Sequence, residues 1–495
     1  MPRASAALQS VLMLLAGAVT TLSFDPFSWP IFSLVAVISA YLLLQKSRSG
    51  FRSGWIFGSG FFGAGVSWVY VSIHYHGGMG VIPAVSMTLA FCLGLGLLFG
   101  LQFYLYKRLF RYPSPLGFAG LWLGFEWLRS WLFTGFPWLY LGYGWIDTPL
   151  ANLAPLGGVW LVSSAVLIVA MLLAYAIQHR SAKPLILGVL ILPASALLPQ
   201  KAINTEGRAI DVALIQPNIS QSLKWQQSHF EEHIRRLGEL SREAESAQWV
   251  IWPETAIPRL INNSFDTLSP WLNELEQRKQ ILVSGFPRRE WNEALERWTY
   301  LNSLGTLTGF PSIYDKQRLV PFGEYIPLEH WLRGAIEFFN LPMSSFSLPT
   351  TPQGSLQVGD QQVAAAICYE IAYPELVRAG VAADAGLIIT LSNDTWFTGS
   401  HAPAQHLQIA RMRALENHRW LIRATNNGLT AVVDPQGRIV ETLSQGEAAV
   451  LTTRVWPSYE QTLYQRFGSY PTLLFWLVTF VTALIYSRRH RSLKH

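Results

Sequence analysis

The sequence predicts a protein built from two parts: a membrane bundle of about eight transmembrane α-helices, and an α/β domain that lies outside the membrane. Three observations predict this fold class. Only 14% of the 495 residues are charged and 50% are hydrophobic, whereas a soluble domain has roughly 25% charged residues. Eight apolar segments are long enough to cross a bilayer. One long polar stretch, between the seventh and the eighth, alternates short β-rich runs with amphipathic segments.

The eight apolar segments lie near 7–23, 27–45, 54–74, 81–105, 115–135, 157–177, 183–199 and 469–487. A helix needs about 20 apolar residues to span the hydrocarbon core of a membrane. The first segment has the length of a signal peptide, but further spans follow it and a clear small-residue cleavage site is missing, so we expect a retained helix. Pro184 and Pro193 interrupt the seventh segment, and proline is tolerated in membrane helices.

The basic residues next to these segments predict their orientation. Thirteen of them lie before the first span, in every second loop and after the last span: Arg3, Lys46, Arg48, Arg52, Lys107, Arg108, Arg111, Arg180, Lys183, Arg488, Arg489, Arg491 and Lys494. The other loops, 23–29, 74–80 and 136–158, contain no Lys or Arg. The positive-inside rule therefore places both termini in the cytoplasm and the polar domain on the opposite side. Without these thirteen charges the net charge of +6 becomes about −7, which argues against a nucleic-acid partner, because such a partner requires a basic face.

The chain divides into a membrane part at 1–207, an external domain at 208–456, and a last span with a basic tail at 457–495. β-rich runs occur in the external domain at 211–216, 249–252, 281–284, 362–367, 386–391 and 430–433. Amphipathic, charged segments such as 229–245 and 405–418 alternate with them. Strands that alternate with helices indicate an α/β domain, in which functional side chains gather at strand ends.

Cys368 is the candidate nucleophile, because it ends the apolar run 364–367 and is followed by the polar Glu370. The other cysteine, Cys92, lies within a hydrophobic segment, where it packs as a small apolar group. A buried structural cysteine is the alternative that this stretch leaves open, since free cysteine is among the most buried residue types.

Two further strand ends carry reactive side chains. Trp252-Pro-Glu254 places a carboxylate after a buried run, and Tyr314-Asp-Lys316 places an amine. Each of these residues alone is more often a solvated surface group. The joint occurrence of Glu254, Lys316 and Cys368 in this order is far more specific.

These residues, together with the segment from Leu319 to Glu324 and Ser392-Asn-Asp-Thr-Trp-Phe397, resemble the Glu-Lys-Cys signature of the nitrilase superfamily. With seven spans upstream, one downstream and Gly135-Phe-Pro-Trp138 in the membrane part, the whole chain is similar to the bacterial apolipoprotein N-acyltransferase family. The resemblance implies a nitrilase-like αββα sandwich on the periplasmic side of the inner membrane. It also implies an acyl transfer from a phospholipid, through a cysteine thioester, to the α-amino group of the S-diacylglyceryl cysteine of an apolipoprotein. No cofactor is implied.

The resemblance assigns roles that fit the chemistry of the side chains. A thiol with a pKa of about 8.5 is only a few per cent ionised at neutral pH, so Cys368 needs a base, and Glu254 serves as one. Lys316 stabilises the oxyanion, helped by backbone amides around Tyr369. Glu324 and Glu370 are expected to support the triad, with a structural salt bridge as the alternative.

Substrate contacts are expected from aromatic residues. Trp225, Tyr369 and Trp396 are candidate walls for acyl chains, although aromatic residues near a site are more often part of the core. The apolar segment 329–352, with Phe338 and Phe339, is expected to form a lid or to dip into the lipid interface.

Three further features remain open. Glu126 and Arg129, three residues apart in the fifth apolar segment, form either a structural ion pair or part of a substrate cavity. The aromatic, glycine-rich loop 135–145 is either an interfacial belt or a guide for a lipid chain. His401 and His406 lack a fixed carboxylate or cysteine partner in the sequence, so we predict no metal site.

Two other functions use the same features. A membrane-anchored amidase or nitrilase that acts on a small amide would need the same triad, and a requirement for a lipid acceptor distinguishes it. A lipid-binding or scaffold protein without activity is the second alternative, and intact Glu254, Lys316 and Cys368 argue against it.

Overall fold

The computed structural model describes residues 3–325, 346–382 and 384–492. The chain forms two compact units, which are described separately. The first consists of Met1–Tyr70, Gly80–Lys201 and Phe467–His495, and the second of Val71–Met79 and Ala202–Arg466. The short segment Val71–Met79 therefore belongs to the unit that contains the polar domain, although its neighbours in the sequence are apolar helices.

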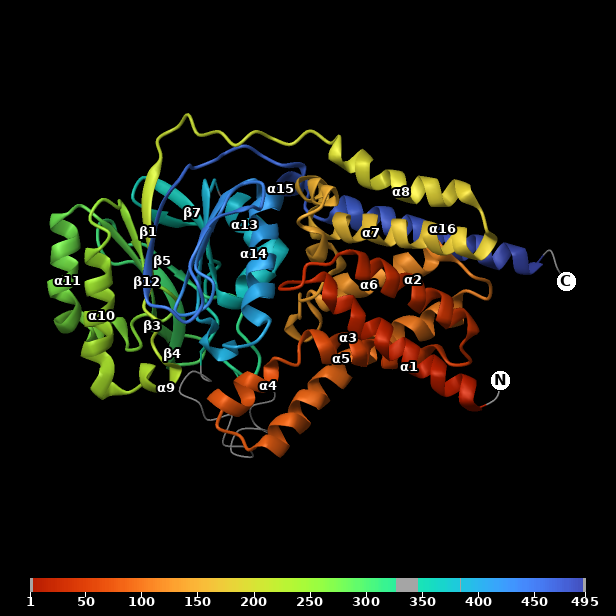
Figure 1. Cartoon of the computed structure of the whole chain (residues 1–495). Helices are drawn as coiled ribbons and strands as arrows, with labels where there is room; N and C mark the ends of the chain where they lie inside the picture. The colour runs from red at the N-terminus through yellow and green to blue at the C-terminus, as the bar shows by residue number, and fades with distance from the viewer. Residues whose placement is uncertain (1–2, 326–345, 383, 493–495) are drawn as a thin grey trace. The chain divides into compact units, whose positions relative to one another are not determined.

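The first unit is helical (Figure 1). Its helices are α1 (Arg3–Thr20), α2 (Ile31–Lys46), α3 (Gly50–Gly65), α5 (Val81–Leu109), α6 (Pro115–Arg129), α7 (Ala154–His179), α8 (Ala182–Ala196) and α16 (Tyr470–Ser492), with the one-turn α4 (Val69–Val71) at its border. Close packing depends on glycine, since a Cβ atom added at Gly54 of α3 would lie 2.0 Å from the carbonyl oxygen of Phe99 on α5. Small residues allow such close approach between membrane helices.

Among the described residues, four helical stretches are long and apolar enough to cross a membrane: Ala6–Ser23, Val81–Leu109, Pro149–His179 and Tyr470–Arg488. The pair Gly50–Gly65 and Val69–His76, bent by 58°, makes a fifth if it is counted as one span. Ile31–Lys46 and Ala182–Ala196 are shorter apolar helices. The predicted fifth span near 115–135 corresponds to α6, which has 15 residues.

Glu126 and Arg129, at the end of α6, hold the aromatic loop that follows. Both side chains are buried. Glu126 Oε1 accepts hydrogen bonds from the backbone N–H of Leu141 at 3.0 Å and from Trp122 Nε1 at 3.2 Å. Arg129 donates to the carbonyl oxygen of Trp138 at 3.1 Å and lies over the ring of Tyr140. These contacts favour the structural role for the pair.

The second unit contains two six-stranded sheets. The first has the order β12-β1-β2-β3-β4-β5 and the second β11-β10-β9-β8-β7-β6. The strands of the first sheet are β1 (Ile210–Gln216), β2 (Trp249–Ile251), β3 (Ile281–Asn292), β4 (Arg297–Thr306), β5 (Ile313–Asp315) and β12 (Ala449–Val455). Those of the second are β6 (Leu356–Val358), β7 (Gln361–Ile367), β8 (Leu387–Ser392), β9 (Trp420–Thr425), β10 (Ala431–Val433) and β11 (Ile439–Thr442). Strands β1, β2 and β3 pair in parallel, as do β7, β8 and β9.

Helices cover the outer face of each sheet, so this unit has four layers in the order αββα (Figure 1). Helices α10 (Phe230–Arg242) and α11 (Phe265–Gln277) pack on the first sheet, and α13 (Pro374–Ala382) and α14 (Ala402–Asn417) pack on the second. The short α9 (Gln221–Lys224) follows β1, and α15 (Leu463–Phe467) contains the point in the chain at which the second unit ends.

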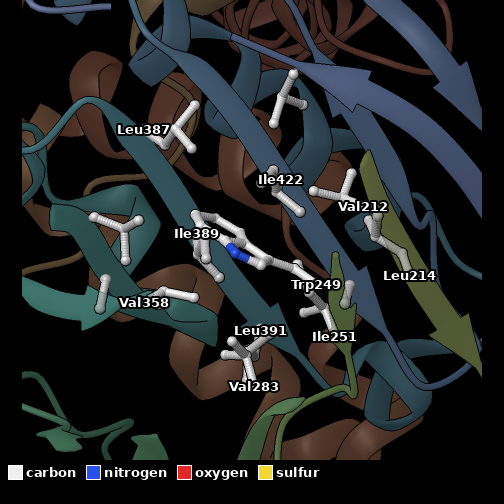
Figure 2. Packing of buried hydrophobic residues seen from close by; sticks show 14 of the residues in the cluster. Val212, Leu214, Trp249, Ile251, Val283, Val358, Leu387, Ile389, Leu391 and Ile422 are labelled. Atoms are coloured by element: carbon white, nitrogen blue, oxygen red, sulfur yellow. The ribbon is translucent and has the colours of Figure 1, made fainter. Parts of the chain in front are cut away.

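The alternation of side chains along each strand builds three apolar layers. Val212 and Leu214 of β1 face the other sheet, whereas Ile215 faces α10. Figure 2 shows Trp249 of the first sheet among Ile389 and Ile422 of the second. Because every strand except the exposed β11 contributes to the core between the sheets, the strand ends are held in place on both sides.

All six β-rich runs predicted from the sequence are strands, and both amphipathic segments are helices, α10 and α14. The α/β class and the αββα sandwich are thereby confirmed. The strands β4, β6, β9, β11 and β12 were not predicted, and β5 was predicted only by its end at Tyr314-Asp-Lys316.

Candidate active site

Strand direction brings the three predicted reactive residues to one edge of the sandwich. Glu254 follows β2, and Cys368 follows β7 directly. β4 runs antiparallel to β3, and β5 runs antiparallel to β4, so β5 points the same way as β3 and delivers Lys316 to the same edge. In α/β proteins, functional groups lie outside the carboxyl ends of such strands.

Lys316 and Glu254 form a buried ion pair. The Lys316 Nζ atom lies 3.3 Å from Glu254 Oε1 and 2.8 Å from Glu324 Oε1. Burial lowers the pKa of Lys316, but the charges of Glu324 and Glu254 outweigh it, so the pKa is raised and the amine stays protonated. Asn302 on β4 donates to both carboxylates at 2.9 Å. The second oxygen of Glu254 accepts the backbone N–H of Asn393, also at 2.9 Å.

Cys368 lies in a strained turn at the end of β7. Its φ of 53° is in the left-handed region, which is costly for a residue with a Cβ atom. The side chain is partly exposed, and Ser392 Oγ lies 3.5 Å from its sulfur. Burial and the charge of Glu254 raise the pKa of the thiol to about 12, although Lys316 acts in the opposite direction. At neutral pH the sulfur therefore carries its proton until a base removes it.

Glu370, fully buried, ties this turn to the segment that carries Lys316. Its Oε2 atom accepts the backbone N–H of Ile367 at 2.8 Å, and Oε1 accepts those of Gln317 at 2.6 Å and Arg318 at 3.1 Å. The hydroxyl of Tyr314 lies 3.2 Å from both oxygens. Burial raises the pKa of Glu370 to about 7, and the backbone hydrogen bonds oppose a further rise.

A second charged cluster lies behind the nucleophile. Asp394, in the short helix η10 (Asp394–Phe397), accepts a hydrogen bond from Arg423 of β9 at 2.6 Å and one from Ser392 at 2.6 Å. Burial alone would raise the pKa of Asp394, but the charges of Arg423 and His406 hold it well below its usual range. His406 Nε2 lies 3.1 Å from the carbonyl oxygen of Cys368.

Lys224, at the end of α9, is a second buried amine near the site. It donates to the backbone carbonyl of Glu254 at 3.0 Å. Burial lowers its pKa to about 8, and the negative charges of Glu254 and of an ionised Cys368 act against that fall. Lys224, Asn302, His406 and Arg423 have site contacts that sequence reasoning missed. The only local signal for Lys224 was its position next to Trp225.

The predicted aromatic walls are partly brought together. Trp225 and Trp396 pack against a small cluster that contains Leu319 and Phe346. The ring of His76, in the π-helix η2 (Ser72–His76), lies 5.7 Å from that of Trp396. The Tyr369 ring contacts Tyr373.

Phe338, Phe339 and most of the predicted lid 329–352 lie outside the described residues. Among the residues that the structure describes, no group of three or more His, Cys, Asp or Glu side chains could hold a metal ion.

Two family models match the chain. The model described as "Apolipoprotein N-acyltransferase N-terminal domain" matches residues 16–172, and the model described as "Carbon-nitrogen hydrolase" matches residues 211–465. A protein named apolipoprotein N-acyltransferase from Pseudomonas syringae pv. tomato is 42% identical over 494 residues and covers 97% of each chain. A protein of the same name from Pseudomonas putida is 42% identical and covers 93% of this chain and 94% of its own. The solved structure of Nit3 from Saccharomyces cerevisiae, described as a member of branch 10 of the nitrilase superfamily, is 19% identical, with a TM-score of 0.38, and covers 52% of this chain and 93% of that chain.

Proposed function

We propose a mechanism from the premise that this chain belongs to the apolipoprotein N-acyltransferase family, to which its relatives connect it over nearly its full length. The protein is a membrane acyltransferase of lipoprotein maturation. It transfers a fatty acyl chain to the α-amino group of the S-diacylglyceryl cysteine of an apolipoprotein. The small-amide alternative is thereby disfavoured.

In the first half-reaction, we propose, Cys368 becomes acylated. Glu254 takes the thiol proton as the sulfur attacks the ester carbonyl of a phospholipid, and a C–S bond forms. Negative charge develops on the carbonyl oxygen next to the protonated Lys316 and the backbone amide of Tyr369, which are suited to stabilise it. The C–O bond then breaks, and Glu254 returns the proton to the alkoxide, which leaves as a lysophospholipid.

In the second half-reaction, the neutral α-amino group of the acceptor attacks the thioester carbonyl. A C–N bond forms, the C–S bond breaks, and the proton lost by the amine passes through Glu254 to the departing sulfur. The product is an amide and the free thiol is restored. This ping-pong order lets two lipid substrates use one site in turn, and it requires no cofactor.

The observation that carries the proposal is the ion pair of Lys316 with Glu254 at the edge where β7 ends in Cys368. The two carboxylates next to Lys316 keep it protonated, as an oxyanion partner must be. The raised pKa of Cys368 explains why a base is required. Glu324 and Glu370 support the site by holding Lys316 and the nucleophile turn, respectively.

Trp225 and Trp396 are proposed to line the acyl chain, because both pack against the apolar cluster around Leu319 and Phe346. Tyr369 is proposed to contribute its backbone amide. Phe338 and Phe339 remain proposed contacts of a lid at 329–352.

For the membrane part, we propose eight spans with both termini in the cytoplasm and a catalytic domain at 208–456 on the periplasmic side of the bacterial inner membrane. The distribution of basic residues supports this orientation. In this orientation the catalytic domain is on the same side as the leaflet from which the phospholipid donor and the lipoprotein acceptor are proposed to come.

The test is the intact mass of the purified protein after incubation with phosphatidylethanolamine, compared with Cys368→Ala. We expect the mass of one acyl chain on the wild type, none on the variant, and loss of the adduct when a diacylglyceryl-cysteine peptide is added. No adduct on the wild type, or an adduct that persists on Cys368→Ala, would refute the thioester mechanism. Discharge by water or a small amine at the same rate as by the peptide would restore the amidase alternative.

A further inference from the structure

His406 contacts the backbone of the nucleophile rather than its thiol. The side chain comes from α14 and is buried. Its Nε2 atom lies 3.1 Å from the carbonyl oxygen of Cys368. Its Nδ1 atom lies 3.0 Å from a guanidinium nitrogen of Arg423 and 3.1 Å from Asp394 Oδ1. Each of these three partners has only one possible role in a hydrogen bond: the carbonyl oxygen and the ionised carboxylate of Asp394 accept, and the guanidinium donates.

These partners determine the tautomer of the ring. Burial and the charge of Arg423 lower the pKa of His406, although Asp394 opposes them, so the ring is neutral. A proton on Nε2 satisfies both the carbonyl oxygen, which only accepts, and the guanidinium, which only donates, whereas a proton on Nδ1 would satisfy Asp394 alone. The single ring proton is therefore assigned to Nε2, where it points at the carbonyl oxygen of Cys368. Nδ1 then accepts from Arg423, and the nearby Oδ1 of Asp394 receives the hydroxyl proton of Ser392.

The hydrogen bond from His406 fixes the orientation of one peptide group. The carbonyl of Cys368 and the N–H of Tyr369 belong to the same planar, trans peptide and point in opposite directions. A donor that holds the carbonyl therefore directs the Tyr369 N–H away from His406. The strained φ of 53° at Cys368 makes such a restraint necessary, because an unrestrained turn would relax towards a commoner conformation.

We propose that His406 is a positioning residue for the acyl-transfer reaction: by holding the Cys368 carbonyl it aims the Tyr369 amide at the oxygen of the tetrahedral intermediate. The inference rests on the proposed mechanism, in which that amide shares the oxyanion with Lys316. Arg423 serves this purpose indirectly, since its charge keeps the ring neutral and its N–H group donates to Nδ1. The residue does not exchange a proton with the substrate.

Two substitutions distinguish the hydrogen bond made by Nε2 of His406 from those made by Nδ1. His406→Gln places an amide N–H group near the position of Nε2, so the donor to Cys368 is retained. His406→Asn has a shorter side chain that reaches only the position of Nδ1, so this donor is lost. His401→Gln is the matched control, because His401 is exposed and immediately precedes the same helix.

Each variant is incubated with phosphatidylethanolamine to measure the rate of thioester formation, and separately with iodoacetamide to measure the alkylation of Cys368. Alkylation builds no oxyanion, so it reports the access and ionisation of the thiol alone. We expect His406→Asn to slow thioester formation by roughly 10²-fold, the usual cost of one oxyanion donor, with alkylation unchanged. His406→Gln and His401→Gln should stay within about threefold of the wild type on both measures, since neither loses that donor.

Equal losses in the Gln and Asn variants, or a parallel fall in alkylation, would overturn the inference, because they indicate a structural role through Arg423. If His406→Asn does not accumulate in membranes, His406→Gln decides alone: normal transfer supports the inference, and a large loss of transfer overturns it. Failure of the proposed mechanism is distinguishable, because it would appear as a wild type that forms no thioester.

Discussion

Removing the charge of Glu254 should change two rates of Cys368 in opposite directions. Burial and the Glu254 charge raise the pKa of the thiol to about 12, and Lys316 lowers it. In Glu254→Gln the side-chain oxygen that faces Lys316 and Asn302 can be kept, while the negative charge disappears. The thiolate then has a cation beside it and one anion fewer.

The size of each effect follows from the same contacts. A charge within a few ångströms shifts a pKa by about 1 to 3 units, so the thiolate fraction at pH 8 should rise about 10- to 10³-fold. Loss of a general base typically costs about 10² to 10⁴ in rate. Direct alkylation of Cys368 should therefore become faster, and thioester formation slower.

The assay uses a Cys92→Ala background, so that Cys368 is the only thiol. Intact mass follows alkylation by iodoacetamide at pH 8 and acylation by phosphatidylethanolamine in parallel samples. Glu245→Gln, at an exposed glutamate of the same unit, is the control for the substitution itself. A fall of both rates in Glu254→Gln would show that the carboxylate holds the site together rather than accepting the proton, and two unchanged rates would show that the base lies elsewhere.

Two further changes test the supports of the site. Glu370→Ala leaves the buried N–H group of Ile367 and the partly buried N–H group of Gln317 without their acceptor, at about 1 to 3 kcal/mol for an unsatisfied buried group. Thermal unfolding in detergent should shift down and thioester formation should slow by at least about tenfold, since a factor of ten needs only about 1.4 kcal/mol; normal acylation would mean that the turn holds its shape without this carboxylate. In the wild type the unfolding temperature should rise between about pH 8 and pH 10, and Lys224→Met should abolish this rise. Burial lowers the pKa of Lys224 to about 8 in the folded protein, so the unfolded chain, with an ordinary lysine pKa of about 10.4, binds more protons there and stability rises with pH. If Lys224→Met shows the same rise of the unfolding temperature as the wild type, another group causes the rise. The control Lys201→Met, at an exposed lysine, should keep the rise.

Two of the strands that sequence patterns missed have identifiable physical reasons. Strand β9 contains Arg423 within an otherwise apolar run, and a charged residue there argues against a buried strand. In the fold this guanidinium is buried because Asp394 and His406 accept its hydrogen bonds. Strand β4 begins at the exposed Arg297 and becomes buried only in its second half. In β9 distant partners, rather than the local pattern, allow the strand to be buried, whereas the exposed start of β4 pairs with the end of the preceding strand β3.

Glu254, Lys316 and Cys368 were predicted together because each lies at a predicted strand end, and the structure brings Glu254 and Lys316 to the edge where β7 ends before Cys368. Asn302 was missed because an asparagine in the middle of β4 has no distinguishing pattern. His406 was considered only as a metal ligand, paired in sequence with His401. In the structure it contacts the backbone carbonyl of Cys368, 38 residues away, together with Asp394 and Arg423.

The sequence by itself determined that apolar helices are combined with an α/β domain, and it determined the order of the candidate reactive residues. Composition, periodicity and strand-end motifs are local properties, so they can be recognised without the fold. Only the tertiary structure decided which groups meet. Lys316 reaches Glu254 across 62 residues, and the N–H of Asn393 reaches the same carboxylate across 139. The protonated state of Lys316 and the raised pKa of Cys368 follow from burial and from these neighbours. Charges act through space, so the chemistry of the site depends on how the two sheets bring the ends of their strands to one edge.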